Sequence, residues 1–135
     1  MIFLLDTNAF SDLMRDHPKV DARLSSLAET DQVVICSIVR GEICYGIERL
    51  PNGKRRQTLE AKAGHLFTVI PCEPVPEAAG DHYARVKLSC QQKGLALDEN
   101  DLWIAATALA IGATLVSRDS DLQPVDRLTV EDWTA

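Results

Sequence analysis

The chain has 135 residues, of which 46% are hydrophobic and 25% charged, and its 14 basic and 20 acidic side chains leave a net charge of -6. This composition is that of one ordinary globular domain and excludes disordered and fibrous classes. No apolar run approaches the roughly 18 residues that a membrane-spanning helix needs. The excess of acid argues against simple electrostatic capture of nucleic acid, whose affinity comes largely from Lys and Arg on phosphates.

Apolar runs predict five strands, at residues 1–5, 32–36, 67–70, 114–117 and 128–130. Helical periodicity and caps predict helices over residues 9–15, 17–28, 37–50, 54–66, 76–93 and 99–111. Strands that alternate with helices are typical of α/β proteins with a mostly parallel sheet. We therefore expect a three-layer α/β/α sandwich that forms a single domain over residues 1–135.

The cysteines indicate a reducing compartment. Cys36, Cys44, Cys72 and Cys90 lie in or beside apolar segments, and no two have C-x-x-C spacing. Residues 1–5 are too short and too uncharged at their start to be a signal peptide. The expected location is the cytoplasm, without a membrane anchor.

Four acids follow or neighbour the predicted strand ends. Asp6 ends the first apolar run, Glu42 lies in the helix after the second strand, Asp101 lies in the first turn of the helix over residues 99–111, and Asp119 follows the strand over residues 114–117. Ligands of open parallel sheets bind outside the carboxyl ends of the strands. We therefore expect these four carboxylates to converge at one edge of the sheet.

Each acid also has a structural interpretation. Asp6 is placed to cap the helix that follows it, and Glu42 can be a solvated helix acid. Asp98 stands three residues before Asp101, which is the spacing of a helix cap, so Asp98 is expected to be the cap. In the loop after residue 117, both Asp119 and Asp121 are available, and a plain turn acid is the alternative for either.

A cluster of like-charged carboxylates is costly unless protons or cations neutralise it. Magnesium and manganese favour oxygen ligands, and no His or Cys spacing in the sequence suggests zinc. We therefore expect Mg²⁺, with Mn²⁺ as an alternative. Such an ion supports phosphodiester hydrolysis, because it lowers the pKa of an attacking water.

The segments LLDTNAF, SIVRGEICYGIERL, ENDLWIAATALAIGATLVSRD and LTVEDW together resemble the PIN-domain ribonucleases, specifically the VapC-type toxins of toxin–antitoxin pairs. The resemblance covers essentially the whole chain. It implies a metal-dependent endoribonuclease that is neutralised by a cognate antitoxin and that forms a homodimer. It assigns the metal site to Asp6, Glu42, Asp101 and, with Asp121 as the competing acid, Asp119. Thr7, Asn8 and Ser117 match positions that support the site by hydrogen bonds.

Two other functions remain open at this stage. An aspartyl-phosphate phosphohydrolase also places an Asp after its first buried strand, but it needs a second Asp two residues on, where this chain has Asn8. A PIN-like module that binds RNA or protein without catalysis is the alternative within the same fold. The complete set of four acids favours the nuclease.

Overall fold

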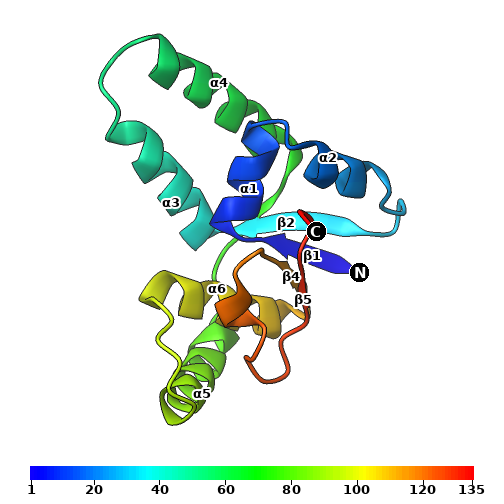
Figure 1. The fold of residues 1–135 in the computed structure, drawn as a ribbon, viewed down its shortest axis with the longest axis vertical. Helices are drawn as coiled ribbons and strands as arrows, with labels where there is room; N and C mark the ends of the chain where they lie inside the picture. Colours follow the sequence, from blue (N-terminus) through cyan, green and yellow to red (C-terminus); the bar gives the residue numbers. More distant parts are fainter.

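The computed structural model describes all 135 residues as a five-stranded parallel sheet between two layers of helices (Figure 1). The strands are β1 (Ile2–Leu5), β2 (Gln32–Cys36), β3 (Cys72–Glu73), β4 (Thr114–Val116) and β5 (Val130–Glu131). Their spatial order is β3-β2-β1-β4-β5. The predicted α/β sandwich with a parallel sheet is therefore confirmed.

The central strand β1 is buried between its two neighbours. Phe3 pairs with Val33 of β2 on one side and with Thr114 of β4 on the other. Phe3, Leu4 and Leu5 are almost fully buried, which explains why β1 is a continuous apolar run rather than an alternating one. Parallel pairing brings the carboxyl ends of β1, β2 and β4 to the same edge of the sheet.

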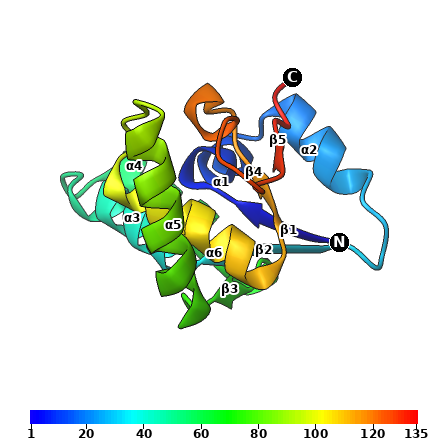
Figure 2. The same cartoon turned by 90° about the horizontal axis from the view of Figure 1, so that it is seen from below.

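Six helices cover the two faces of the sheet. They are α1 (Thr7–Met14), α2 (Pro18–Ser25), α3 (Ser37–Glu48), α4 (Lys54–Val69), α5 (Ala78–Gln92) and α6 (Glu99–Ile111). Figure 1 shows α1 to α4 above the sheet and α5 and α6 below it, and the view from below in Figure 2 has α5 and α6 in front. None of these helices is both long and apolar enough to cross a membrane.

The predicted strand at residues 67–70 is wrong. Helix α4 continues to Val69, and the third strand is the short β3 just beyond Pro71. The side chain of Phe67 stacks on Phe10 of α1, with ring centroids 5.2 Å apart, and the guanidinium of Arg40 lies 4.1 Å from the Phe67 ring centroid. These contacts hold the apolar run in the helix despite its β-branched residues.

Helix α6 begins and ends where capping chemistry predicts. The side chain of Asp98 accepts a hydrogen bond from the Asp101 backbone N–H at 2.9 Å, which confirms Asp98 as the N-cap. The helix ends at Gly112, whose φ of 67° is the left-handed conformation that glycine adopts freely. Ala105 and Ala108 are fully buried, so the helix packs closely on the sheet with Asp101 held in its first turn.

Candidate metal centre

Asp6 is both a helix cap and a buried carboxylate. It directly follows β1, it is only 4% exposed, and its Oδ1 accepts a 2.8 Å hydrogen bond from the Ala9 backbone N–H. Burial raises the pKa of Asp6, hydrogen bonds from Ser117 and Ala9 act in the opposite direction, and the charge of Asp119 raises it further. The capping role is confirmed, and it fixes the carboxylate rigidly at the sheet edge.

Ser117 connects two of the predicted site acids. Its side chain is buried, it hydrogen-bonds to Asp6, and its Oγ accepts a 3.1 Å hydrogen bond from the Asp119 backbone N–H. Asp119 in turn caps the 3-10 turn Ser120–Leu122 by accepting from the Asp121 N–H at 2.9 Å. The loop after β4 is thereby held with Asp119 toward Asp6.

Thr7 connects α1 to the acid of α3. The Thr7 hydroxyl donates a 2.6 Å hydrogen bond to Glu42 Oε1. Thr7 comes directly after Asp6, so the end of β1 positions one acid itself and a second one through this hydroxyl. Asn8, the third predicted supporting residue, is exposed on α1, and its support of the site stays a prediction.

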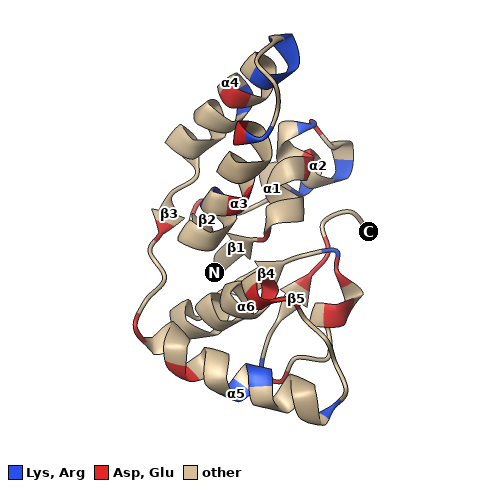
Figure 3. Cartoon of the chain, turned by 90° about the vertical axis from the view of Figure 1, so that its left-hand side faces the viewer, with Lys and Arg blue, Asp and Glu red and all other residues tan.

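The pKa of Asp101 is affected by the charges of the other acids at this edge. Its pKa is raised to about 7, first by burial and then by the negative charges of four carboxylates, which are Asp98, Asp119, Glu42 and Asp6 in order of decreasing effect. Asp101 therefore lies within electrostatic range of Asp119, Glu42 and Asp6, which come from separate segments of the chain. Figure 3 shows acidic segments on α3, at the start of α1 and on α6 in the same region. Asp121 is exposed and is absent from the charges that act on Asp6 or Asp101, which favours Asp119 over Asp121.

The side chains at this edge offer only oxygen donors. No three carboxyl, imidazole or thiol groups of the chain lie close enough together to form a ready-made cage for a metal ion. Mg²⁺ does not require such a cage, because it keeps several waters and takes only one or two protein carboxylates. The hard oxygen donors and the uncompensated negative charge on Asp101 fit a divalent cation of this kind.

Asp12 is a buried acid of α1 that sequence reasoning missed. Its side chain is 4% exposed, and its Oδ1 accepts from Arg15 Nη2 at 2.7 Å. Its Oδ2 has no hydrogen-bond partner and lies 3.6 Å from Arg118 Nε. Arg118 immediately precedes Asp119 in the loop after β4, so Asp12 helps to hold this loop through the Arg118 side chain. A single Asp inside an amphipathic helix carries no signal that separates it from a surface acid.

An open groove lies beside Glu42. It encloses about 600 Å³ and is lined by Thr7 and Glu42 together with residues of α3 and with Asn100 of α6. Tyr45 projects at this groove and is 68% exposed, and Arg49 lies 6.0 Å from its ring centroid. The groove leaves Glu42 open to solvent.

The comparisons with known proteins agree with this fold. The sequence matches the PIN domain family over residues 3–128. It is 30% identical to "Ribonuclease VapC1" of Haemophilus influenzae (strain R2866), with 99% of each chain covered, and 29% identical to "Ribonuclease VapC2" of Rickettsia felis, with 98% of each covered.

Solved structures show the same likeness. VapBC2 from Rickettsia felis, bound to a DNA fragment from the promoter, gives a TM-score of 0.89 at 28% identity and covers 98% of this chain and 99% of the other. VapBC-1 from nontypeable Haemophilus influenzae gives a TM-score of 0.88 at 29% identity, with 100% of both chains covered. The chain therefore belongs to the PIN domain family, among the relatives of the VapC ribonucleases.

Proposed function

We propose that this protein is an endoribonuclease toxin that hydrolyses RNA phosphodiester bonds with a divalent cation held by Asp6, Glu42, Asp101 and Asp119. The observation that carries this function is the partly buried carboxyl of Asp101, whose pKa is raised to about 7 first by burial and then by the negative charges of neighbouring acids, among them Asp119, Glu42 and Asp6. The family membership and the ribonuclease names of relatives that align over nearly the whole chain support the same reaction.

The proposed cation is Mg²⁺, with Mn²⁺ able to replace it, because both favour oxygen ligands. When bound, the ion supplies a nucleophilic water at neutral pH and neutralises charge on the phosphate. Asp6 and Asp119, after β1 and β4, and Asp101 and Glu42, on α6 and α3, would hold it. Asp101, whose pKa is raised to about 7, would have to be deprotonated to act as a ligand.

The supporting residues hold these carboxylates in place. Thr7 orients Glu42 through the 2.6 Å hydrogen bond, and Ser117 ties Asp6 to the Asp119 backbone. Asn8 is proposed as a third supporting group at the open face of α1. Residues that orient metal ligands typically affect affinity or activity by about 10–100-fold when they are replaced.

The groove beside Glu42 is the proposed path of the RNA. Its exposed aromatic ring at Tyr45 and the neighbouring guanidinium of Arg49 suit unpaired bases and backbone phosphates, which is how proteins commonly hold single-stranded RNA. Local cations of this kind reconcile RNA binding with a net charge of -6.

A cognate antitoxin is the proposed partner, and a homodimer the proposed assembly. The solved VapBC structures from Rickettsia felis and Haemophilus influenzae support the antitoxin, because their toxin chains align with almost all of this chain. The proposed location is the cytoplasm, which the four free cysteines support.

The test is RNA cleavage by purified protein with Mg²⁺ or Mn²⁺, compared with excess EDTA and with Asp6→Asn. We expect the wild type to cleave RNA with Mg²⁺ or Mn²⁺. We expect no cleavage in excess EDTA or by Asp6→Asn. Cleavage that survives both controls would contradict the metal mechanism. If no RNA is cut and the protein still binds RNA, the alternative of a non-catalytic binding module is correct.

A further inference from the structure

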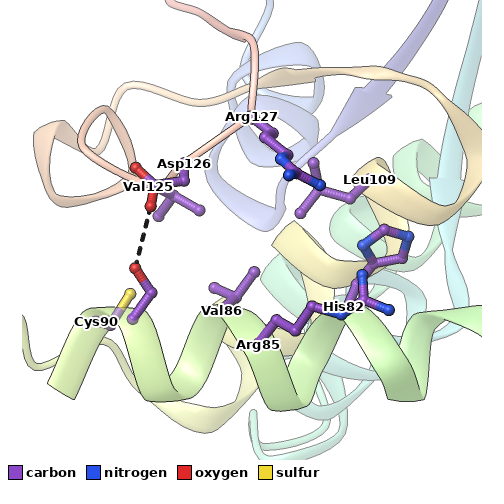
Figure 4. Close-up of a pocket in the computed structure, with 9 residues that line it drawn as sticks. His82, Arg85, Val86, Cys90, Leu109, Val125, Asp126 and Arg127 are labelled. Carbon is purple, nitrogen blue, oxygen red and sulfur yellow. Dashed lines mark hydrogen bonds between the residues drawn. The ribbon is translucent and has the colours of Figure 1, made fainter. Parts of the chain in front are cut away.

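A second pocket lies away from the acids, between α5, the last turns of α6 and the loop that leads to β5 (Figure 4). It encloses about 260 Å³. Val86, Leu109 and Val125 give it an apolar floor, and His82, Arg85 and Arg127 give it basic groups. The pocket is therefore amphipathic, with positive charge beside an apolar surface.

The side chains of the two arginines of this pocket make no hydrogen bond with the protein, although the charge of Arg127 contributes to the lowered pKa of Asp126. Neither Arg85 nor Arg127 takes part in an ion pair, although half of the chain's basic side chains do. The only carboxylate of the lining, Asp126, is already held by Lys93 Nζ at 2.7 Å and by the Ser89 hydroxyl at 3.3 Å. In Figure 4 this hydrogen-bonded end lies apart from the end where the basic side chains gather.

The backbone of Arg127 is in an unusual conformation. Its φ of 64° is left-handed, which costs free energy for a residue with a Cβ. Such residues persist where the surrounding structure holds them, and they cluster at ligand sites. In Figure 4 the Arg127 side chain extends over the pocket toward Leu109.

We propose that this pocket binds the phosphate of a nucleotide, with Arg85 and Arg127 on the phosphate oxygens and the base or ribose against Val86, Leu109 and Val125. Guanidinium groups match phosphate oxygens in bidentate geometry, and two unpaired guanidiniums at one pocket repel each other until an anion joins them. The volume is below the roughly 300–1,000 Å³ of pockets that enclose drug-sized ligands, so it suits one nucleotide unit.

Nucleotide binding here is separate from the proposed metal centre. Leu109 follows Asp101 by eight residues along α6, which is about 12 Å at the rise of an α-helix. The nucleotide is either free or the phosphorylated end of an RNA strand, and both present the same phosphate ester to the two arginines.

The test is calorimetric titration with uridine 5′-monophosphate, in EDTA, of a protein that carries Asp6→Asn so that neither cleavage nor metal binding contributes. Binding should weaken about tenfold or more when uridine replaces the monophosphate, and by a similar factor in Arg85→Gln and in Arg127→Asn. Asn is chosen at 127 because it tolerates a positive φ. Lys54→Gln, which removes an unpaired positive charge at the start of α4, should bind like the parent protein.

Equal binding of uridine and its monophosphate would overturn this assignment. So would unchanged binding in both arginine variants, with thermal unfolding confirming that they are folded. A comparison of one RNA hexamer with and without a 5′-phosphate separates the two sources, because only a strand-end site prefers the phosphorylated hexamer. This readout needs no nuclease activity, so its failure and the failure of the proposed function are distinguishable.

Discussion

The hydroxyl of Thr7 donates a 2.6 Å hydrogen bond to Glu42 Oε1 and thereby joins the end of β1 to α3 across 35 residues of sequence. This contact leaves Glu42 beside the open groove and within electrostatic reach of Asp101. The position of the Glu42 carboxylate therefore depends on the Thr7 hydroxyl.

Thr7→Val should lower the RNA cleavage rate by about 10–100-fold, because Glu42 loses the donor that orients it. Thr7→Ser keeps the hydroxyl and should retain most of the activity. Initial rates at saturating Mg²⁺ measure both variants. Equal rates for Val and Ser would show that the hydrogen bond has no part in the reaction.

Asp119→Asn and Asp121→Asn form a matched pair that decides between the two loop acids. The charge of Asp119 raises the pKa of both Asp6 and Asp101, whereas Asp121 is exposed and is not among the main charges that shift either pKa. Cleavage should fall by about 100-fold or more in Asp119→Asn, since metal-ion catalysis is worth several kcal/mol, and should change little in Asp121→Asn. Both are assayed on the same RNA, and the reverse order would assign the site to Asp121.

Ser117→Ala should weaken Mn²⁺ binding by about tenfold or more, because Asp6 and the Asp119 backbone both lose their shared hydroxyl. Calorimetric titration with Mn²⁺ measures the change. Ser120→Ala, in the same loop but on an exposed residue, is the control and should bind Mn²⁺ like the wild type. Equal affinities in Ser117→Ala and wild type would remove Ser117 from the site.

Asp101 should make the metal-free protein less stable as the pH rises. Its folded pKa of about 7 lies above its ordinary value of 3.8, so between these two values the folded state binds more protons than the unfolded state. The stabilisation is complete below pH 3.8 and is lost as the pH rises through 7. Asp101→Asn should therefore raise the free energy of unfolding at pH 8 in EDTA by on the order of 1 kcal/mol, allowing for solvent screening, while it abolishes cleavage.

Urea unfolding at pH 5 and pH 8 checks this expectation. The gain from Asp101→Asn should be larger at pH 8 than at pH 5, where much of the wild-type Asp101 is already protonated. Asp121→Asn, which removes an exposed charge that is not among those raising the pKa of Asp101, serves as the control. A gain that does not depend on pH would mean that the charge of Asp101 is not destabilising.

Much of the fold could be predicted because its boundaries have local chemical causes. The strand Gln32–Cys36 and the helix Glu99–Ile111 were predicted at their observed bounds, since an apolar run defines the first and Asp98 and Gly112 define the second. The strand predicted at residues 67–70 failed because a tertiary contact of Phe67 with Phe10 decides that segment. The secondary-structure propensity of residues 67–70 does not indicate a contact with a distant helix.

Some features of the candidate site could also be predicted from local sequence, and others could not. Asp6 and Asp98 could be recognised as caps from their position before a helix, and the structure has both caps. The hydrogen bond between Thr7 and Glu42 forms only when their helices meet in the folded chain. The contact of the buried Asp12 with Arg118 likewise depends on the fold. Long-range contacts of this kind have no periodicity or spacing by which one sequence could indicate them.

The most direct test of the central claim is calorimetric titration of the wild type and of Asp6→Asn with Mn²⁺ at neutral pH. Asp6 is the most deeply buried of the four acids, and Asn preserves the cap to Ala9 while it removes the charge. We expect the wild type to bind Mn²⁺ and Asp6→Asn to bind it about 100-fold more weakly or not at all. Equal affinity in the two proteins, or no binding by either, would contradict a metal centre built on these carboxylates.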